Sequence, residues 1–290
     1  MNRPTKLERE IEAFIFDEHA FTAPGSNIIH SAAGAKEFGF GGALVGGQTI
    51  YGWSVPVSMG VLGDEWIDTG WAEFRFRQPT YPGDKLKIVV EQQSDGSHSL
   101  SAAGPDGVPR LVGKVGLGDA PWVNDLARST RLAAEPPVED GRSQLTIANA
   151  PVGQDLRAMT VDGSEETARK TAAQSLATEH PLFTGEHPRI HPGTYTNLTG
   201  LLKHTYDFAP SIHVATRVQH RRPAHAGQVL TLTGRCVETF HKGTDDYVVV
   251  DGSMLGEGQE ELRRIRHTVI FSVAKRGSTP AASEASTAGR

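Results

Sequence analysis

Two short stretches of this chain recur, in similar form, in its second half. Pro82-Gly83-Asp84-Lys85-Leu86 matches Ala226-Gly227-Gln228-Val229-Leu230, and Gly47-Gln48-Thr49 matches Gly193-Thr194-Tyr195. The two matches have nearly the same offset, and self-similarity at a fixed offset is the signature of a duplicated unit. A chance alignment of turn glycines is the alternative. The repeat therefore predicts two copies of one structural unit.

The first copy is predicted to be a buried helix followed by antiparallel strands. Gln48 to Leu62 is apolar with little charge, which is typical of a helix that is buried on most sides. Strands are expected at Trp71 to Arg77, Lys85 to Glu91 and Leu111 to Leu117, the first two of them from alternating side chains. The charged stretch from Leu7 to Phe16 alternates poorly, and we expect a short helix there.

The second copy repeats this order of elements. A helix is expected from Ser164 to Leu176, with Ser164 as its cap, and a second, mostly apolar helix from Gly193 to Phe208. Strands are then expected at Ser211 to Gln219, Val229 to Phe240, Tyr247 to Leu255 and Leu262 to Val273. The predicted fold class is therefore α+β.

Composition places the boundaries between these copies. We predict an N-terminal domain at 1–125, a linker at 126–148, a C-terminal domain at 149–275 and a disordered tail at 276–290. The linker is polar and contains Glu135-Pro136-Pro137, which opposes regular structure, and the tail is rich in Ser, Ala and Thr.

Charge and cysteine content exclude several function classes. The chain carries 29 basic and 34 acidic residues, so it lacks the basic surplus of a nucleic-acid clamp. Cys236 is the single cysteine, which excludes an intramolecular disulfide or a thiolate zinc site. We find neither a signal peptide nor an apolar run long enough for a membrane span, and expect a cytoplasmic protein.

One stretch carries a family resemblance. Ser26-Asn27-Ile28-Ile29-His30, Phe38-Gly39-Phe40 and Gly46-Gly47-Gln48-Thr49 follow one another as the motifs of the MaoC-like hydratase/dehydratase family do. Phe76 to Asp84 resembles the strand and Pro-Gly-Asp turn of that family. The resemblance implies a double hotdog, in which two antiparallel sheets each wrap a buried helix.

The resemblance also implies an activity and a site. The family hydrates or dehydrates acyl thioesters carried by coenzyme A or an acyl carrier protein, which would make this chain a hydro-lyase. His30 and Asn27 would be the catalytic residues. Gly46, Gly47 and Gln48 would bind the substrate at the start of the buried helix, where backbone N–H groups can stabilise charge on the thioester oxygen. No cofactor or metal is implied.

The motif is degenerate in both copies. Its aspartate falls on Gly25 in the first copy, and the histidine of its His-Gly pair falls on Gly46. In the second copy the aspartate falls on Thr178 and the catalytic histidine on Phe183. The candidates for a substitute carboxylate are Asp17, Glu18, Asp64, Glu65 and Asp68, although each is also a normal surface or capping charge.

The missing carboxylate leaves other functions open. His30 could act as the sole base in an elimination, cyclisation or isomerisation. The chain could instead be a non-catalytic partner of another hotdog protein or, less favoured, a thioesterase, and both a homodimer and a hetero-partner are compatible with the sequence. A cluster of histidines between 180 and 225 lacks metal-ligand spacing. Arg221-Arg222 could meet a coenzyme A phosphate or form a solvated turn, and we expect Cys236 to be a core residue.

Overall fold

The computed structural model describes residues 3–17, 21, 26–208 and 210–275. Gly25, Glu18 and the predicted tail at 276–290 lie outside this part of the chain. Within it, no helix is long and apolar enough to cross a membrane.

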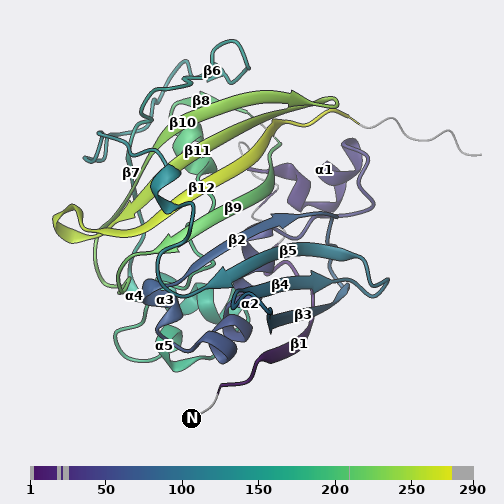
Figure 1. Cartoon of the computed structure of the whole chain (residues 1–290). Helices are drawn as coiled ribbons and strands as arrows, with labels where there is room; N and C mark the ends of the chain where they lie inside the picture. The colour runs from purple at the N-terminus through teal and green to yellow at the C-terminus, as the bar shows by residue number, and fades with distance from the viewer. Residues whose placement is uncertain (1–2, 18–20, 22–25, 209, 276–290) are drawn as a thin grey trace, which may run out of the picture.

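The fold is built on one antiparallel sheet of ten strands (Figure 1). From edge to edge the strands are β1 (Lys6–Glu12), β3 (Lys85–Gln92), β4 (His98–Ala103), β5 (Pro109–Gly116), β2 (Trp71–Phe76), β9 (Ile212–His220), β12 (Glu261–Ser272), β11 (Asp245–Leu255), β10 (Leu230–Lys242) and β7 (Met159–Val161).

The prediction of two separate sheets is therefore wrong in one respect. Strand β2 of the first half pairs antiparallel with β9 of the second, with Trp71 opposite Gln219 and Arg75 opposite Ala215. Each strand would otherwise leave an unpaired edge of N–H and C=O groups. Pairing the two edges satisfies these groups and joins the halves into one continuous sheet.

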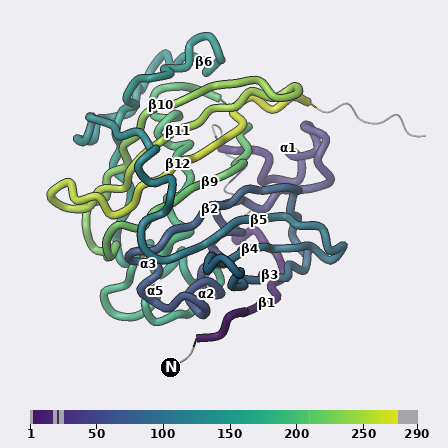
Figure 2. Tube along the Cα trace, viewed as in Figure 1, coloured from purple at the N-terminus to yellow at the C-terminus, as the bar shows by residue number. Residues whose placement is uncertain are grey.

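The strand order confirms that the unit is duplicated. The order β1-β3-β4-β5-β2 in the first half is mirrored by β7-β10-β11-β12-β9 in the second. Figure 2 shows this order along the trace from β1 to β10. Matching turns precede β3 and β10. The N–H of Gly83 donates to Ala13 O at 2.8 Å and that of Gly227 to Gly163 O at 2.7 Å. Both Gly83 and Gly227 have φ near +90°, a backbone conformation that glycine adopts without steric cost.

The predicted buried helix is present as α2 (Gly47–Leu62). It lies against the sheet, and Tyr51, Trp53 and Val55 on it are completely buried. Because it is apolar on nearly every side, it forms the centre of the main hydrophobic core.

Among its described residues, the second copy has no helix as long as α2. The expected helix from Gly193 to Phe208 is only α6 (Thr199–Lys203). A Cβ on Gly193 would lie 2.7 Å from the Cα of Gly52, so this segment runs directly against α2. Tyr195 also has φ of +60°, which is outside the helical region. Contact with α2 and this local backbone conformation thus replace the first part of the expected helix.

The other helical segments are short. Ser164 caps α4 (Glu165–Lys170) by accepting from Thr167 N–H at 3.3 Å, as predicted, and a π-helical turn follows at Thr171–Ser175. The rest are a 3-10 turn at Ile28–His30, α1 (Ala32–Glu37), α3 (Trp66–Thr69), a 3-10 turn at Val123–Asp125, α5 (Pro181–Thr184) and a 3-10 turn at Glu257–Gln259.

The charged N-terminal stretch is the strand β1, not a helix. Its side chains alternate between exposed Lys or Glu and half-buried positions that include Leu7 and Ile11. Leu7 packs over Gly60 of α2, where a Cβ would lie 2.4 Å from its Cδ2. The strand period is therefore present, but the density of charge makes it hard to recognise.

The predicted linker packs along the second copy. Residues 126–142 contain no helix or strand, and the N–H of Ala127 donates to the buried Asp251 carboxylate at 2.7 Å. Beyond them, β6 (Ser143–Gln144) pairs in parallel with β8 (Tyr206–Asp207). The division of the chain into domains at 125 and 149 stays a prediction.

Candidate functional site

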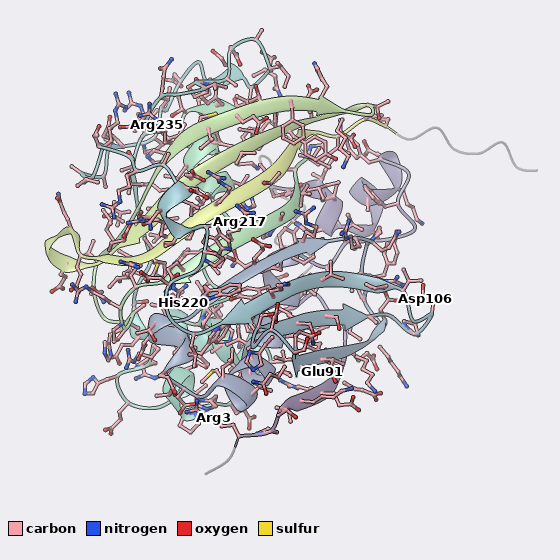
Figure 3. The ribbon with its side chains drawn as sticks, in the orientation of Figure 1. Arg3, Glu91, Asp106, Arg217, His220 and Arg235 are labelled. Carbon is pink, nitrogen blue, oxygen red and sulfur yellow. The ribbon has the colours of Figure 1, made fainter. Side chains whose placement is uncertain are left out.

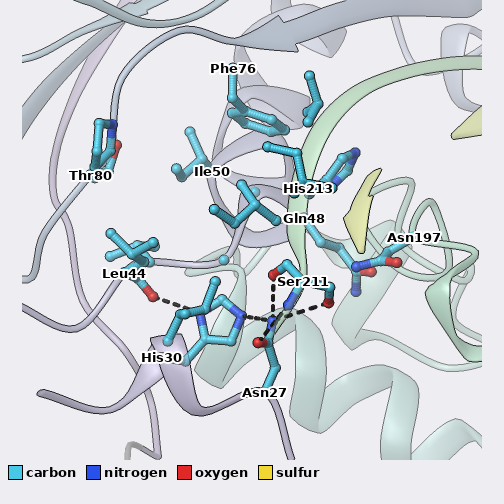
Figure 4. A pocket seen from close by; sticks show the side chains of 18 of the residues that line it. Asn27, His30, Leu44, Gln48, Ile50, Phe76, Thr80, Asn197, Ser211 and His213 are labelled. Carbon is cyan, nitrogen blue, oxygen red and sulfur yellow. Dashed lines mark hydrogen bonds between the residues drawn. The ribbon is translucent and has the colours of Figure 1, made fainter. Parts of the chain in front are cut away.

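The structure brings all the predicted site residues to one cavity. This cavity of about 460 Å³ is lined by Asn27, His30, Gly46, Gly47 and Gln48 (Figure 4). Both copies build it, because Asn197, Ser211, Ile212, His213, Val214, Tyr247 and Ile270 of the second half also line it. Most of the remaining lining is apolar and includes Ile29, Phe40, Leu44, Val45, Ile50 and Phe76.

His30 is held as a neutral imidazole of defined tautomer. Its Nδ1 lies 2.7 Å from the carbonyl oxygen of Leu44. A carbonyl only accepts hydrogen bonds, so Nδ1 carries the proton and Nε2 carries the lone pair. Burial lowers the pKa of His30 below 6.5, the hydrogen bond to Leu44 opposes this shift, and the positive charge of Lys203 reinforces it. His30 is therefore a free base at neutral pH.

Asn27 joins His30 to the second copy. Its Oδ1 accepts from Ser211 N–H at 3.1 Å, and its Nδ2 donates to Ser211 O at 2.8 Å. This pair of bonds fixes the orientation of the amide. Nδ2 also lies 3.2 Å from His30 Nε2 and can donate its second hydrogen there. Asn27 thus acts as a bridge that aligns His30 with the start of β9.

The N-terminus of α2 offers hydrogen-bond donors to the cavity. Gly46 is its N-cap residue and Gly47 and Gln48 are its first two residues, so the N–H groups of Gly47 and Gln48 have no partner within the helix. A Cβ on Gly47 would lie 2.6 Å from the ring of Phe76 and 3.1 Å from His213 Nδ1. Glycine is required there sterically. Unpaired N–H groups at a helix N-terminus favour a negatively charged oxygen.

Among the described residues that line this cavity there is no Asp or Glu. Asp17 lines a neighbouring cavity of about 190 Å³ that shares His30 and Gly46 with the larger one. The other described candidates are bound elsewhere, Asp64 to His180, Glu65 to Arg3 and Asp68 to Arg189. Asp17 is therefore the candidate carboxylate that the fold brings near His30.

The corresponding place in the second copy is filled. Leu44 N–H donates to Ile29 O, and Arg189 N–H donates to Leu182 O in the same way. The residues that follow, His30 and Phe183, are therefore structural counterparts. Phe183 has no exposed surface, and its ring centroid is 4.4 Å from that of His191. An aromatic ring stands where the first copy places its imidazole.

Comparison with known proteins identifies the architecture. No family model matches the chain, and no curated protein matches it. Among solved structures, a MaoC domain protein assigned as a dehydratase, from Chloroflexus aurantiacus J-10-fl, superposes with a TM-score of 0.59 at 14% identity, over 94% of this chain and 95% of that one. A MaoC-like dehydratase superposes at 0.53 and 14% identity, over 83% and 88% of the two chains.

A third structure decides the description of the fold. A conserved hypothetical protein from Mycobacterium tuberculosis, which has a double hotdog fold, superposes at 0.56 and 14% identity over 87% of this chain and 90% of its own. This chain is a double hotdog. Its fold is that of MaoC-like dehydratases over most of its length, as the resemblance implied, although its sheet is continuous.

The structure also shows where the remaining candidate residues from the sequence lie. The described residues contain no group of three His, Cys, Asp or Glu side chains that could hold a metal. Arg221 and Arg222 are bound to Asp119 and Glu260 at 2.8 and 2.9 Å. Cys236 is buried, and burial raises the pKa of its thiol to about 11.

Sequence reasoning missed the individual residues that the second copy contributes. Asn197, Ser211 and His213 carry no motif, and each reaches the cavity through contacts over a long sequence separation. The repeat was the sequence signal that could have pointed to these residues. Two copies that share one sheet bring the start of β9 next to the end of β2.

Proposed function

We propose that this double hotdog is an acyl-thioester hydratase/dehydratase with His30 as its general acid and base. The observation that carries the proposal is the neutral imidazole of His30 in a cavity lined by both copies, beside the uncapped N–H groups of Gly47 and Gln48. A base and a set of oxyanion donors are the two elements that addition of water to an α,β-unsaturated thioester requires. The carrier would be coenzyme A or an acyl carrier protein.

The residues suggest the following sequence of steps. Water displaces the Asn27 NH₂ group from Nε2 of His30, and Nε2 takes a proton from this water as the water oxygen bonds to the β carbon. The π electrons of the double bond move onto the thioester oxygen, which accepts from the N–H groups of Gly47 and Gln48. The imidazolium of His30 then gives its proton to the α carbon. One water is added, and dehydration is the reverse. Asn27 orients His30 through its bond to Ser211.

Loss of the conjugated thioester absorbance with crotonyl-CoA and longer or branched enoyl-CoAs tests the proposal. His30→Ala should lower kcat/KM by roughly 10²- to 10⁴-fold, the usual contribution of a general acid–base group. Its unfolding temperature should stay close to that of the wild type. His241→Ala is the matched control, because the His241 side chain is 70% exposed and lies outside the cavity. Full activity of His30→Ala would refute the proposal.

The lining also supports a second candidate. Because no carboxylate is among the described lining residues, His30 could act alone in an isomerisation, elimination or cyclisation. Such chemistry removes a proton from carbon and needs no activated water. In D₂O, deuterium incorporation without hydration, lost in His30→Ala, would favour it. Absence of all turnover, together with co-purification of a hotdog protein that has the full Asp–His motif, would favour a partner subunit.

A further inference from the structure

Two carboxamides in the cavity have NH₂ groups without a partner among the described residues. Asn197 Oδ1 accepts from Thr199 N–H at 2.8 Å, which fixes its amide, and its NH₂ group lines the cavity. The Gln48 carboxamide makes no hydrogen bond to any residue that the structure describes, and neither does the Asn197 NH₂ group. In Figure 4 both carboxamides point to the same end of the cavity, away from His30. A half-buried amide without a partner costs free energy, and a ligand that forms a hydrogen bond to it removes this cost.

The polar groups named at this end of the cavity, Gln48, Asn197 and His213, are uncharged. His213 lies against Gly47 at the same end, and its Nε2 is 2.6 Å from Thr216 Oγ1. Burial lowers the pKa of His213 to about 3, so its ring is neutral. Arg77 is the charged residue among the described lining residues, and it is exposed to solvent. The groups at this end suit a neutral hydrogen-bonding atom better than an ion or a plain hydrocarbon.

The spacing along β9 separates this end from the reacting carbons. Ser211 anchors Asn27, and through it His30, whereas His213 lies two residues further along. Residues i and i+2 of an extended chain point to the same side and are separated by roughly 6–7 Å. A group that meets Gln48 and Asn197 is therefore separated by several bonds from the carbon that lies beside His30.

We propose that Gln48 and Asn197 recognise a neutral oxygen, a hydroxyl or a ketone, on the acyl chain beyond its β carbon. This inference rests on the proposed function, because it takes the acyl thioester as the ligand. The NH₂ groups would donate to the oxygen, and the Gln48 carbonyl could accept from a hydroxyl. The preferred substrate is then an oxygenated acyl thioester, and an unsubstituted fatty acyl chain would leave both amides unpaired.

The test uses saturated ligands, which cannot be hydrated, so that binding is read separately from catalysis. Dissociation constants of 5-oxohexanoyl-CoA, 5-hydroxyhexanoyl-CoA, hexanoyl-CoA and 5-carboxypentanoyl-CoA are measured by calorimetry. We expect one of the two oxygenated ligands to bind roughly 10- to 100-fold more tightly than hexanoyl-CoA, as one or two recovered hydrogen bonds allow. The carboxylate ligand should bind no better than hexanoyl-CoA.

Two variants connect this preference to the amides. Asn197→Asp keeps an oxygen for Thr199 N–H but removes the NH₂ donor, and Gln48→Leu removes the other amide while it leaves the backbone N–H in place. Each should reduce the preference at least threefold. Asn149→Asp is the matched control, since Asn149 Oδ1 also accepts a backbone N–H, from Thr146 at 2.8 Å, but lies outside the cavity. It should keep the wild-type preference.

The outcomes separate this inference from the proposed function. Equal or tighter binding of hexanoyl-CoA, tightest binding of the carboxylate ligand, or failure of all four to bind would overturn the inference. So would a preference that survives both variants. An oxygen preference in binding without hydration of any enoyl-CoA would support the inference while refuting the hydratase. Hydration of enoyl-CoAs without an oxygen preference would do the opposite.

Discussion

Replacement of His220 by phenylalanine should make the protein more resistant to acid. His220 ends β9, next to α3 (Figure 3), and is 1% exposed. Neither ring nitrogen has a partner among the described residues, and the ring meets Trp66 edge-on with centroids 5.5 Å apart. In the first copy the equivalent residue is Phe76, because Arg77 and Arg221, which follow, make matching bonds to the neighbouring strand. The duplicated unit therefore already accommodates a phenylalanine at this position in its first copy, and we expect it to accommodate one at 220.

The size of the effect follows from proton linkage. Burial, reinforced by the positive charge of Arg263, lowers the pKa of His220 well below 6.5. Below pH 6.5 the unfolded chain binds a proton that the folded chain does not, so acidification favours unfolding by about 1.4 kcal/mol per pH unit for this residue. At pH 5 the loss is at most about 2 kcal/mol. The variant should avoid this loss, and at pH 7.5 it should also gain about 1–3 kcal/mol by removing unsatisfied buried polar atoms.

Urea unfolding between pH 7.5 and pH 5, followed by tryptophan fluorescence, measures both the gain in stability at pH 7.5 and the loss of stability in acid. The wild type should lose stability steeply, because His191 and His213, whose pKa values burial lowers to about 3, add about 2 kcal/mol each at pH 5. His220→Phe should reduce the slope by about 1.4 kcal/mol per pH unit. The control His241→Phe replaces an exposed histidine that is paired with Asp246, and it should not reduce the slope. A slope equal to that of the wild type in His220→Phe would refute the reasoning, since it would mean that folded His220 titrates normally.

Three further predictions concern the cavity. Because burial lowers the pKa of His30 and the neutral ring is the base, kcat/KM should stay constant from pH 8 to below 6.5 and fall only at more acid pH, as a pH profile of turnover will show. Asn27→Asp places a carboxylate beside His30 and opposite the Ser211 carbonyl, so the acid limb of that profile should move to higher pH and stability in urea should fall by about 1–3 kcal/mol. Gly47→Ala sets a methyl 2.6 Å from the Phe76 ring. It should lower the free energy of unfolding by about 1–3 kcal/mol, as thermal unfolding will show, and lower turnover at least tenfold. Unchanged values for both would contradict the close approach.

The sequence carried the local part of this fold and missed the long-range part. The apolar run at Gln48 to Leu62, the alternating strands and the glycine at the turn before β3 are local patterns, and each matches an element of the structure. The single sheet depends on pairing between β2 and β9, which no local pattern encodes. The shortened α6 depends on the approach of Gly193 to Gly52 of α2. In the site, His30 was found from its motif, whereas Ser211 was found only once the fold had joined the copies.

The two copies differ in whether the counterpart positions of the site are open or filled. Gly46 and His191 are structural counterparts as well, because Thr49 N–H donates to Gly46 O as Thr194 N–H donates to His191 O. At these counterpart positions the first copy has His30 and Gly46, and there the space stays open. The second has Phe183 and His191, whose rings fill that space, and full burial of a phenylalanine stabilises a fold by about 1.5–3 kcal/mol. The filled copy still contributes Ser211 to the open one, so neither half can form the site alone. After duplication, the second copy can thus fill its own cavity with core side chains and still line the cavity of the first copy.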